Sequence, residues 1–204
     1  HGVGQTEFQD NTTNRYNVSI GSYAGQRVIG TANAHIGYKA GMNASGSNNT
    51  FMGYEAGLGG TTSAPYSSGQ YNTAVGRNTL KEFTSGNYNV AMGYNAGDAI
   101  TTGGNNTCIG AFAGSSLTTK SFNTIVGQGA GSALSGGDGN NNIFGYAAGG
   151  LQTNGYMTTA IGSLAWYGAS GTNNSNYGVY VGNSAGQNVT TGDYNVMVGH
   201  KAGK

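Results

Sequence analysis

The stretch NNTCIGAFAG, residues 105–114, recurs with small changes along almost the whole chain. It is written NNTFMGYEAG at residues 48–57 and YNVAMGYNAG at residues 88–97. Each version has Asn, then Thr or Val, a variable residue, an apolar residue and Gly, and it closes on Ala-Gly. A repeat of this kind is typical of a solenoid, in which one unit cannot bury its own apolar face and so covers its neighbour's.

The first Gly of the motif marks eleven copies of the repeat. They lie at Gly21, Gly37, Gly53, Gly76, Gly93, Gly110, Gly127, Gly145, Gly162, Gly182 and Gly199. A period near 17 residues is short for a pair of helices, and Gly at this density costs a helix about 1 kcal/mol per residue. The repeat therefore predicts an all-β, parallel β-solenoid of about eleven 16–18-residue coils.

A second apolar position follows the first Gly by about seven residues. It is occupied by Val28, Phe83, Ile100, Leu117, Leu134 and Val189. These residues lie in short stretches such as SSLTTK, between Gly turns. Each coil is therefore expected to contribute two short strands, which pair in parallel with the equivalent strands of the neighbouring coils at about 4.8 Å.

The first strand of each coil is apolar on both faces. In NTCIG, Thr107 and Ile109 share one face because side chains alternate along a strand, and we expect that face to fill the coil. The variable residue then points outward, yet it is apolar at positions such as Ile125 and Ile143. A strand that is apolar on both faces is usually buried on both, which predicts an oligomer. The same assignment turns Thr inward and argues against an ice-binding face.

The Asn that opens the motif is present in nine of the eleven copies. These are Asn17, Asn33, Asn49, Asn72, Asn89, Asn106, Asn123, Asn141 and Asn195. Equivalent Asn side chains in stacked coils are expected to form a ladder of hydrogen bonds to one another and to the turn backbone. The repeated Gly is expected where the backbone needs positive φ or approaches a neighbour closely.

NNTFMGYEAG, YNTAVG and FNTIVGQGAG resemble the repeats of trimeric phage tail fibres and tail spikes and, more loosely, the heads of YadA-like trimeric autotransporter adhesins. The resemblance covers about residues 17–203. It implies a left-handed β-roll, a homotrimer, and a virion tail-fibre segment that recognises a glycan or an outer-membrane protein of the bacterial surface. The alternatives are an adhesin head on the bacterial outer surface, a glycan-degrading tail spike and a purely structural fibre shaft.

Composition narrows the class of protein. Charged residues make up 7% of the chain and the net charge is +1, so no basic stripe indicates nucleic acid or an anionic membrane as a partner. No apolar run approaches the ~20 residues of a membrane helix, so membrane insertion is not expected. One cysteine excludes an internal disulfide. Residues 1–16 are interpreted as a lead-in or cap and residues 17–204 as the solenoid.

No catalytic, metal or cofactor site emerges from the sequence, and we expect a protein that is not an enzyme. Glu82 and Asp98 are one coil apart and are the only carboxylate pair considered for glycan cleavage, but solvated turn residues explain them as well. GGDGNNNIF, residues 136–144, matches a calcium-binding repeat only once, with Asn141 where Asp is required. His35 occupies a variable position and is interpreted as a packed interface histidine.

Two insertions interrupt the period, near residues 58–69 and 166–178. Insertions in a solenoid leave as loops on one face, and such loops often carry function. Aromatic residues there are the candidate ligand-binding residues: Trp166, Tyr167, Tyr177 and Tyr66. For Trp166, which replaces the second Gly of the motif, plugging a wider coil is an equally weighted alternative.

Overall fold

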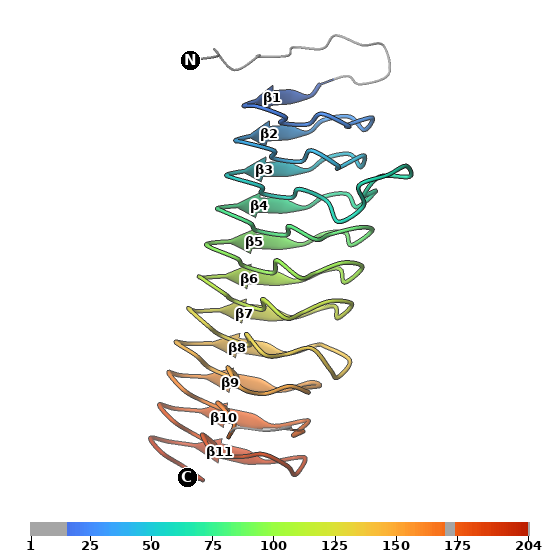
Figure 1. The fold of residues 1–204 in the computed structure, drawn as a ribbon. Helices are drawn as coiled ribbons and strands as arrows, with labels where there is room; N and C mark the ends of the chain where they lie inside the picture. The colour runs from blue at the N-terminus through green and yellow to red at the C-terminus, as the bar shows by residue number, and fades with distance from the viewer. Residues whose placement is uncertain (1–15, 170–173, 204) are drawn as a thin grey trace.

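The structure is a computed structural model that describes residues 16–169 and 174–203. These residues form a parallel β-solenoid of stacked coils, with no helix among them. One strand per coil builds a single sheet whose strand order follows the chain (Figure 1). The strands are β1 (Val18–Ile20), β2 (Ala34–Ile36), β3 (Thr50–Met52), β4 (Thr73–Val75), β5 (Val90–Met92), β6 (Thr107–Ile109), β7 (Thr124–Val126), β8 (Asn142–Phe144), β9 (Thr159–Ile161), β10 (Val179–Val181) and β11 (Val196–Val198).

Each strand pairs in parallel with the equivalent strand of the next coil, position for position, as in Cys108 opposite Ile125. The predicted second strand is wrong. Its apolar residues do point into the coil, but each follows a tight turn; the amide of Leu117 donates to the carbonyl of Gly114 at 3.1 Å and that of Ile100 to Gly97 at 3.1 Å. Because these turn bonds hold the backbone in a curled conformation, the segment cannot extend into a strand.

The predicted orientation of the strand is also wrong. The middle residue of each strand points into the coil, and Ile125 and Ile143, expected at an interface, are fully buried there. The first and third residues point outward, so Thr107 and Ile109 lie on the outer face. A three-residue strand turns one side chain to one face and two to the other. The interior also holds the motif Ala and the second apolar residue, which leaves room for only one strand side chain per coil.

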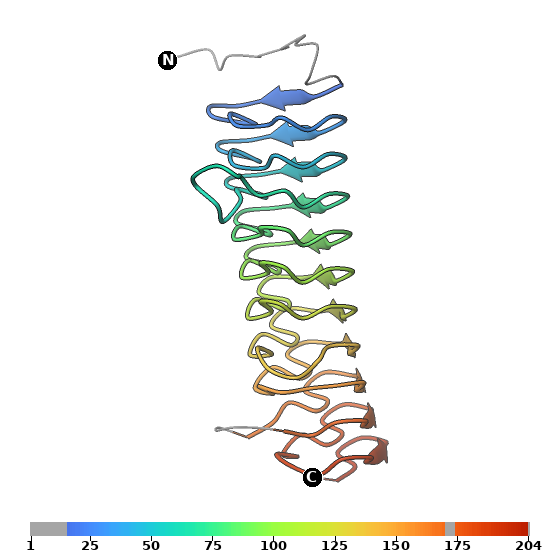
Figure 2. The ribbon, with the colours of Figure 1, turned by 90° about the vertical axis from the view of Figure 1, so that its right-hand side faces the viewer.

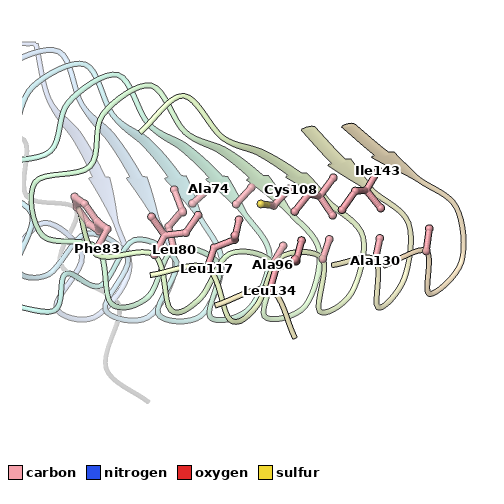
Figure 3. Packing of buried hydrophobic residues seen from close by; sticks show 14 of the residues in the cluster. Ala74, Leu80, Phe83, Ala96, Cys108, Leu117, Ala130, Leu134 and Ile143 are labelled. Carbon is pink, nitrogen blue, oxygen red and sulfur yellow. The ribbon is translucent and has the colours of Figure 1, made fainter. Parts of the chain in front are cut away.

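Two facing rows of side chains make up the core (Figure 3). One row comes from the strands and includes Ala74, Cys108 and Ile143, and the other comes from the opposite wall and includes Leu117 and Leu134. The core is a narrow column rather than a globular centre. Each coil therefore depends on the coils above and below it to cover its apolar side chains.

The motif Gly is required by close backbone approach between coils. Gly110 has φ +126°, and a Cβ on it would lie 2.7 Å from the carbonyl carbon and oxygen of Gly127 in the next coil. No side chain fits at that distance, and few L-residues adopt that φ. The stacking distance of the sheet thus explains the most regular feature of the sequence.

The predicted Asn ladder is confirmed from Asn17 to Asn141. Each Asn Oδ1 accepts the backbone N–H of the next residue in the ladder, as Asn106 Oδ1 does from Asn123 at 3.1 Å. Most of the Nδ2 groups donate to a turn carbonyl of the next coil, as Asn106 Nδ2 does to Lys120 at 2.8 Å, whereas Asn123 Nδ2 donates to Ser121, two residues before it, at 3.2 Å. The ladder passes to the N–H of Thr158 and ends there, since Thr158 and Gly178 replace Asn in the next two coils.

Of the predicted lead-in, residues 1–15 lie outside the described part of the chain. The first insertion, residues 58–69, projects beyond the stack as a loop below β3 (Figure 2). The second insertion is described except for residues 170–173. In the described ranges no helix has the length and apolar character needed to cross a bilayer.

Candidate interaction surfaces

The outer face of the sheet carries an uninterrupted column of apolar side chains, one from the third position of every strand. It consists of Ile20, Ile36, Met52, Val75, Met92, Ile109, Val126, Phe144, Ile161, Val181 and Val198. Seven of the eleven are at least 36% exposed and the other four are half-buried. Their partners at the first strand position are Thr, Val, Ala or Asn, so neither position carries a charge. We call these two positions together the outer strand face.

Aromatic side chains flank the outer strand face on both sides. On the side that follows the strands, Tyr38 and Tyr54 stack at 5.1 Å. The guanidinium carbon of Arg77 lies 5.2 Å from the ring centroid of Tyr54 and 5.9 Å from that of Tyr94. Arg77 therefore lies between the two tyrosines and extends the column of stacked side chains. These rings are 38–45% exposed. Such cation–π contacts contribute about 0.5–1 kcal/mol each at exposed sites.

The second aromatic column lies on the side that precedes the strands, in the residue before the ladder position. Tyr71 and Tyr88 stack there at 4.9 Å with rings 1° from parallel. Tyr177 and Tyr194 stack at 4.8 Å with rings 8° from parallel. The stacking follows from the solenoid itself, because equivalent residues in adjacent coils repeat at the strand spacing of about 4.8 Å.

Trp166 is a core residue in the structure, with 0% exposure, so a ligand cannot reach it. It stands at φ +50°, in the place of the second motif Gly, and its coil has the small Ala160 as the inward strand residue. Leu80 replaces the same Gly in the coil of Ala74. In these two coils a large residue at this position fills the space that a small strand residue leaves, and the plugging alternative describes Trp166.

The other three predicted ligand-binding residues do not come together. Tyr66 lies in the first insertion, half-buried, with the Arg27 guanidinium 5.3 Å from its ring centroid. Tyr177 is 38% exposed and lies two residues before the start of β10. About six strand spacings, or ~29 Å, separate the coils of these two residues. Tyr167 is half-buried and packs near Gly150.

Tyr177 borders an open pocket of about 340 Å³ formed by the segments that precede β8, β9 and β10. Its lining residues are Gly137, Asp138, Asn154, Tyr156, Asn174, Asn176 and Tyr177. Sequence analysis missed all of these except Tyr177. The available signal was weak: Asn154 and Asn174 each stand four residues before a ladder position, and each is followed by a Tyr within three residues.

Hydrogen bonds hold the polar wall of this pocket in place. Asp193 Oδ1 accepts the backbone N–H of Asn176 at 2.8 Å and its Nδ2 at 3.1 Å. The same Nδ2 also donates to Asn174 Oδ1 at 3.2 Å. The pKa of Tyr177 is raised, mainly by partial desolvation. The nearby hydroxyls of Tyr194 and Tyr156 and the carboxylates of Asp193 and Asp138 raise it further.

Three titratable groups outside the pocket have pKa values that are shifted mainly by burial. Burial lowers the pKa of His35 to about 4 and raises the pKa of Cys108 to about 12, so both are neutral inside the core. Burial, with a smaller contribution from Glu82, raises the pKa of the Asp98 carboxyl. Among the residues that the structure describes, no three His, Cys, Asp or Glu side chains gather where they could hold a metal ion.

Comparison of the chain with protein-family models, with curated proteins and with solved structures gives no match.

Proposed function

We propose that this chain is a non-catalytic segment of a phage tail fibre that assembles as a homotrimer through its outer strand face and recognises the bacterial surface. The observation that carries the proposal is the uninterrupted apolar column on that face. The largest apolar patch of a typical monomer covers about 300–600 Å² and often mediates an interaction. A column that extends over all eleven strands is typical of a surface that is buried in an assembly.

A second copy of the same chain is the partner that fits the outer strand face best. The face repeats once per coil, so a parallel copy offers the same spacing along its full length. Neither surface brings a charge that would be buried without a partner. Homo-oligomers adopt closed symmetry, and the number three rests on the resemblance to tail fibres and to YadA-like heads.

The recognition role is supported by what the outer strand face leaves free. Tyr177, the loop of residues 58–69 and the open pocket beside β10 stand outside that face. Rigid aromatic side chains offer large contact areas at low entropic cost. In a trimer each site appears three times, so weak contacts with a repetitive bacterial surface add up by avidity. A glycan or an outer-membrane protein is the receptor class in this proposal, and the location is the virion.

The proposal is tested with Ile161→Asp, a change in the middle of the apolar column where the parent side chain is 43% exposed. The variant is expected to keep the β-rich circular dichroism of the parent and to elute as a monomer, because a charge buried at the interface costs several kcal/mol. Fluorescently labelled parent protein is expected to bind a panel of bacteria, and the variant to bind at least tenfold less. Unchanged assembly by the variant, or no binding of the parent to any strain, would contradict the proposal.

Ice binding is a second candidate, because five threonines stand on the outer face rather than in the core: Thr50, Thr73, Thr107, Thr124 and Thr159. A flat array of outward Thr is able to order water against a crystal surface. However, Val, Ala and Asn interrupt this row in the other six strands. Thermal hysteresis in a nanolitre osmometer distinguishes the two functions, and a clear freezing-point gap would favour ice binding over the fibre.

A further inference from the structure

The pocket beside β10 is lined by side chains that are not part of the repeat motif, although the backbone of Asn154, Tyr156 and Asn174 forms bridges between coils. It draws on three successive coils, and its residues belong to neither the core nor the Asn ladder. We infer that this pocket binds a neutral pyranose unit of a surface glycan. The inference deepens the proposed function and rests on it for the bacterial source of that glycan.

The aromatic wall provides the apolar contact that a sugar ring requires. Tyr177 is 38% exposed, is backed by Tyr194 at 4.8 Å and meets Tyr156 at 5.3 Å with rings 79° apart. These neighbours hold the Tyr177 ring in one orientation. A pyranose has a face of C–H groups, which carry partial positive charge and pack on the negative face of an aromatic ring.

The polar wall offers hydrogen bonds in a fixed arrangement. The bonds among Asp193, Asn176 and Asn174 restrict the two amide side chains before a ligand arrives. Side chains that are already ordered lose less entropy on binding. Amide groups both donate and accept, and carboxylates accept. This combination matches adjacent sugar hydroxyls, each of which is both a donor and an acceptor.

Charge selects a neutral sugar over an acidic one. Asp138 lines the pocket, and its carboxylate has no hydrogen-bond or ion-pair partner within residues 16–169 and 174–203. Asp193 adds a second carboxylate next to Asn176. Both favour hydroxyl donors and repel the carboxylate of a uronic or sialic acid.

Three glycines of this region lie at close contacts. A Cβ on Gly136 would overlap Asn154 Oδ1, and a Cβ on Gly137, at φ +71°, would lie 2.4 Å from the carbonyl oxygen of Gly155. Side chains at either position would therefore displace Asn154 or the neighbouring coil. Gly136 therefore makes room for the pocket side chain Asn154, whereas Gly137 and Gly139, whose Cβ would lie 2.1 Å from the carbonyl oxygen of Ser121, let the neighbouring coils stack.

The test uses saturation-transfer NMR on the full chain, with the methyl glycosides of glucose, galactose and mannose as probes and methyl glucuronide as the acidic probe. Tyr177→Ala and Asn174→Ala are compared with Tyr88→Ala. Tyr88 is the matched control because it also directly precedes a ladder position and stacks on a neighbouring Tyr at 4.9 Å, but it does not line the pocket. Melting temperatures establish that all three variants fold.

At least one neutral glycoside is expected to bind the parent, and Tyr177→Ala and Asn174→Ala are expected to weaken that binding at least tenfold while Tyr88→Ala does not. Absence of binding by every neutral glycoside, tighter binding of the glucuronide, or equal losses at Tyr177 and Tyr88 would overturn the inference. If the pocket fails but the parent still binds bacteria, only the pocket assignment is lost. If the glycoside binds but bacteria do not, the proposed function fails and the pocket stands.

Discussion

Replacing Asn106 with Ala removes one rung of the Asn ladder in the middle of the stack. Asn106 is 1% exposed and lies between Asn89 and Asn123. The change leaves the N–H of Asn123 without its acceptor, previously at 3.1 Å, and the carbonyl of Lys120 without its donor, previously at 2.8 Å. The narrow coil has no other polar side chain at this position to replace them.

The expected loss follows from those two backbone groups. An unsatisfied buried polar group costs about 1–3 kcal/mol, and the Lys120 carbonyl lies in a partly buried bond, so its share is at the low end. The sum is about 2–4 kcal/mol. For a chain of this size 1 kcal/mol shifts the melting temperature by about 2–4 °C. We therefore expect Asn106→Ala to melt about 5–15 °C below the parent.

Two measurements check this result. Thermal melting by circular dichroism compares Asn106→Ala with Asn188→Ala, whose parent side chain is exposed and outside the ladder. Hydrogen exchange then reports on the amide of Asn123, which is expected to lose protection while amides of distant coils keep theirs. Equal melting of the two variants, or unchanged protection at Asn123, would refute the structural role of the ladder.

Three further predictions concern the core and the coil spacing. Gly110→Ala is expected to prevent folding or to lower the melting temperature far more than Gly199→Ala. Both residues have φ near +126°, but of the two only Gly110 has neighbouring backbone, that of Gly127, 2.7 Å from the position of a Cβ. Equal losses in melting temperature would mean that φ alone matters. Trp166→Gly is expected to lower the free energy of unfolding, measured by chemical denaturation, by about 3–5 kcal/mol. Adding Ala160→Phe is expected to recover part of this loss, because the larger strand residue fills the space that Trp166 leaves. A double variant that is no more stable than the single one would contradict this reasoning. The pKa of His35 is about 4 in the folded protein and 6.5 in the unfolded chain, so the unfolded state binds more protons between these pH values. The free energy of unfolding therefore falls by about 3 kcal/mol as the pH drops from 6.5 to 4. His35→Phe is expected to remove this part of the pH dependence, and identical pH profiles of parent and variant would contradict the prediction.

The repeat contained enough information for the fold class and the Asn ladder, but not for the number of strands in each coil. The fold class and the ladder each depend on a residue that only one environment tolerates: Gly110 cannot carry a side chain, and Asn106 satisfies both an N–H and a carbonyl of the next coil. Alternation along a strand gave the correct grouping of Thr107 with Ile109, but not the direction. Because both faces of the strand are apolar, hydrophobicity does not show which face points into the coil. The inward position is indicated instead by volume, since the small Ala160 is paired with the large Trp166 in the same coil.

The candidate site was less accessible from sequence for a different reason. Its residues come from three coils of unequal length, and their meeting depends on how each segment curls before its strand. Asn154 fits only because Gly136 lacks a side chain, and Asn174 is held through Asn176. Such contacts between coils do not follow from the period. Tyr177 and Trp166 were both selected because aromatic residues in inserted loops often make contacts; Tyr177 lines the pocket, whereas Trp166 is buried in the core.

The native mass of the parent protein tests the central claim most directly, since the outer strand face is proposed to be buried between copies of the chain. Size-exclusion chromatography with multi-angle light scattering measures that mass without reference to shape. The expected value is ~62 kDa, three times the 20.6 kDa of one chain. A folded, β-rich species of 20.6 kDa at micromolar concentration would show that the apolar column is stable in water, and would contradict the account.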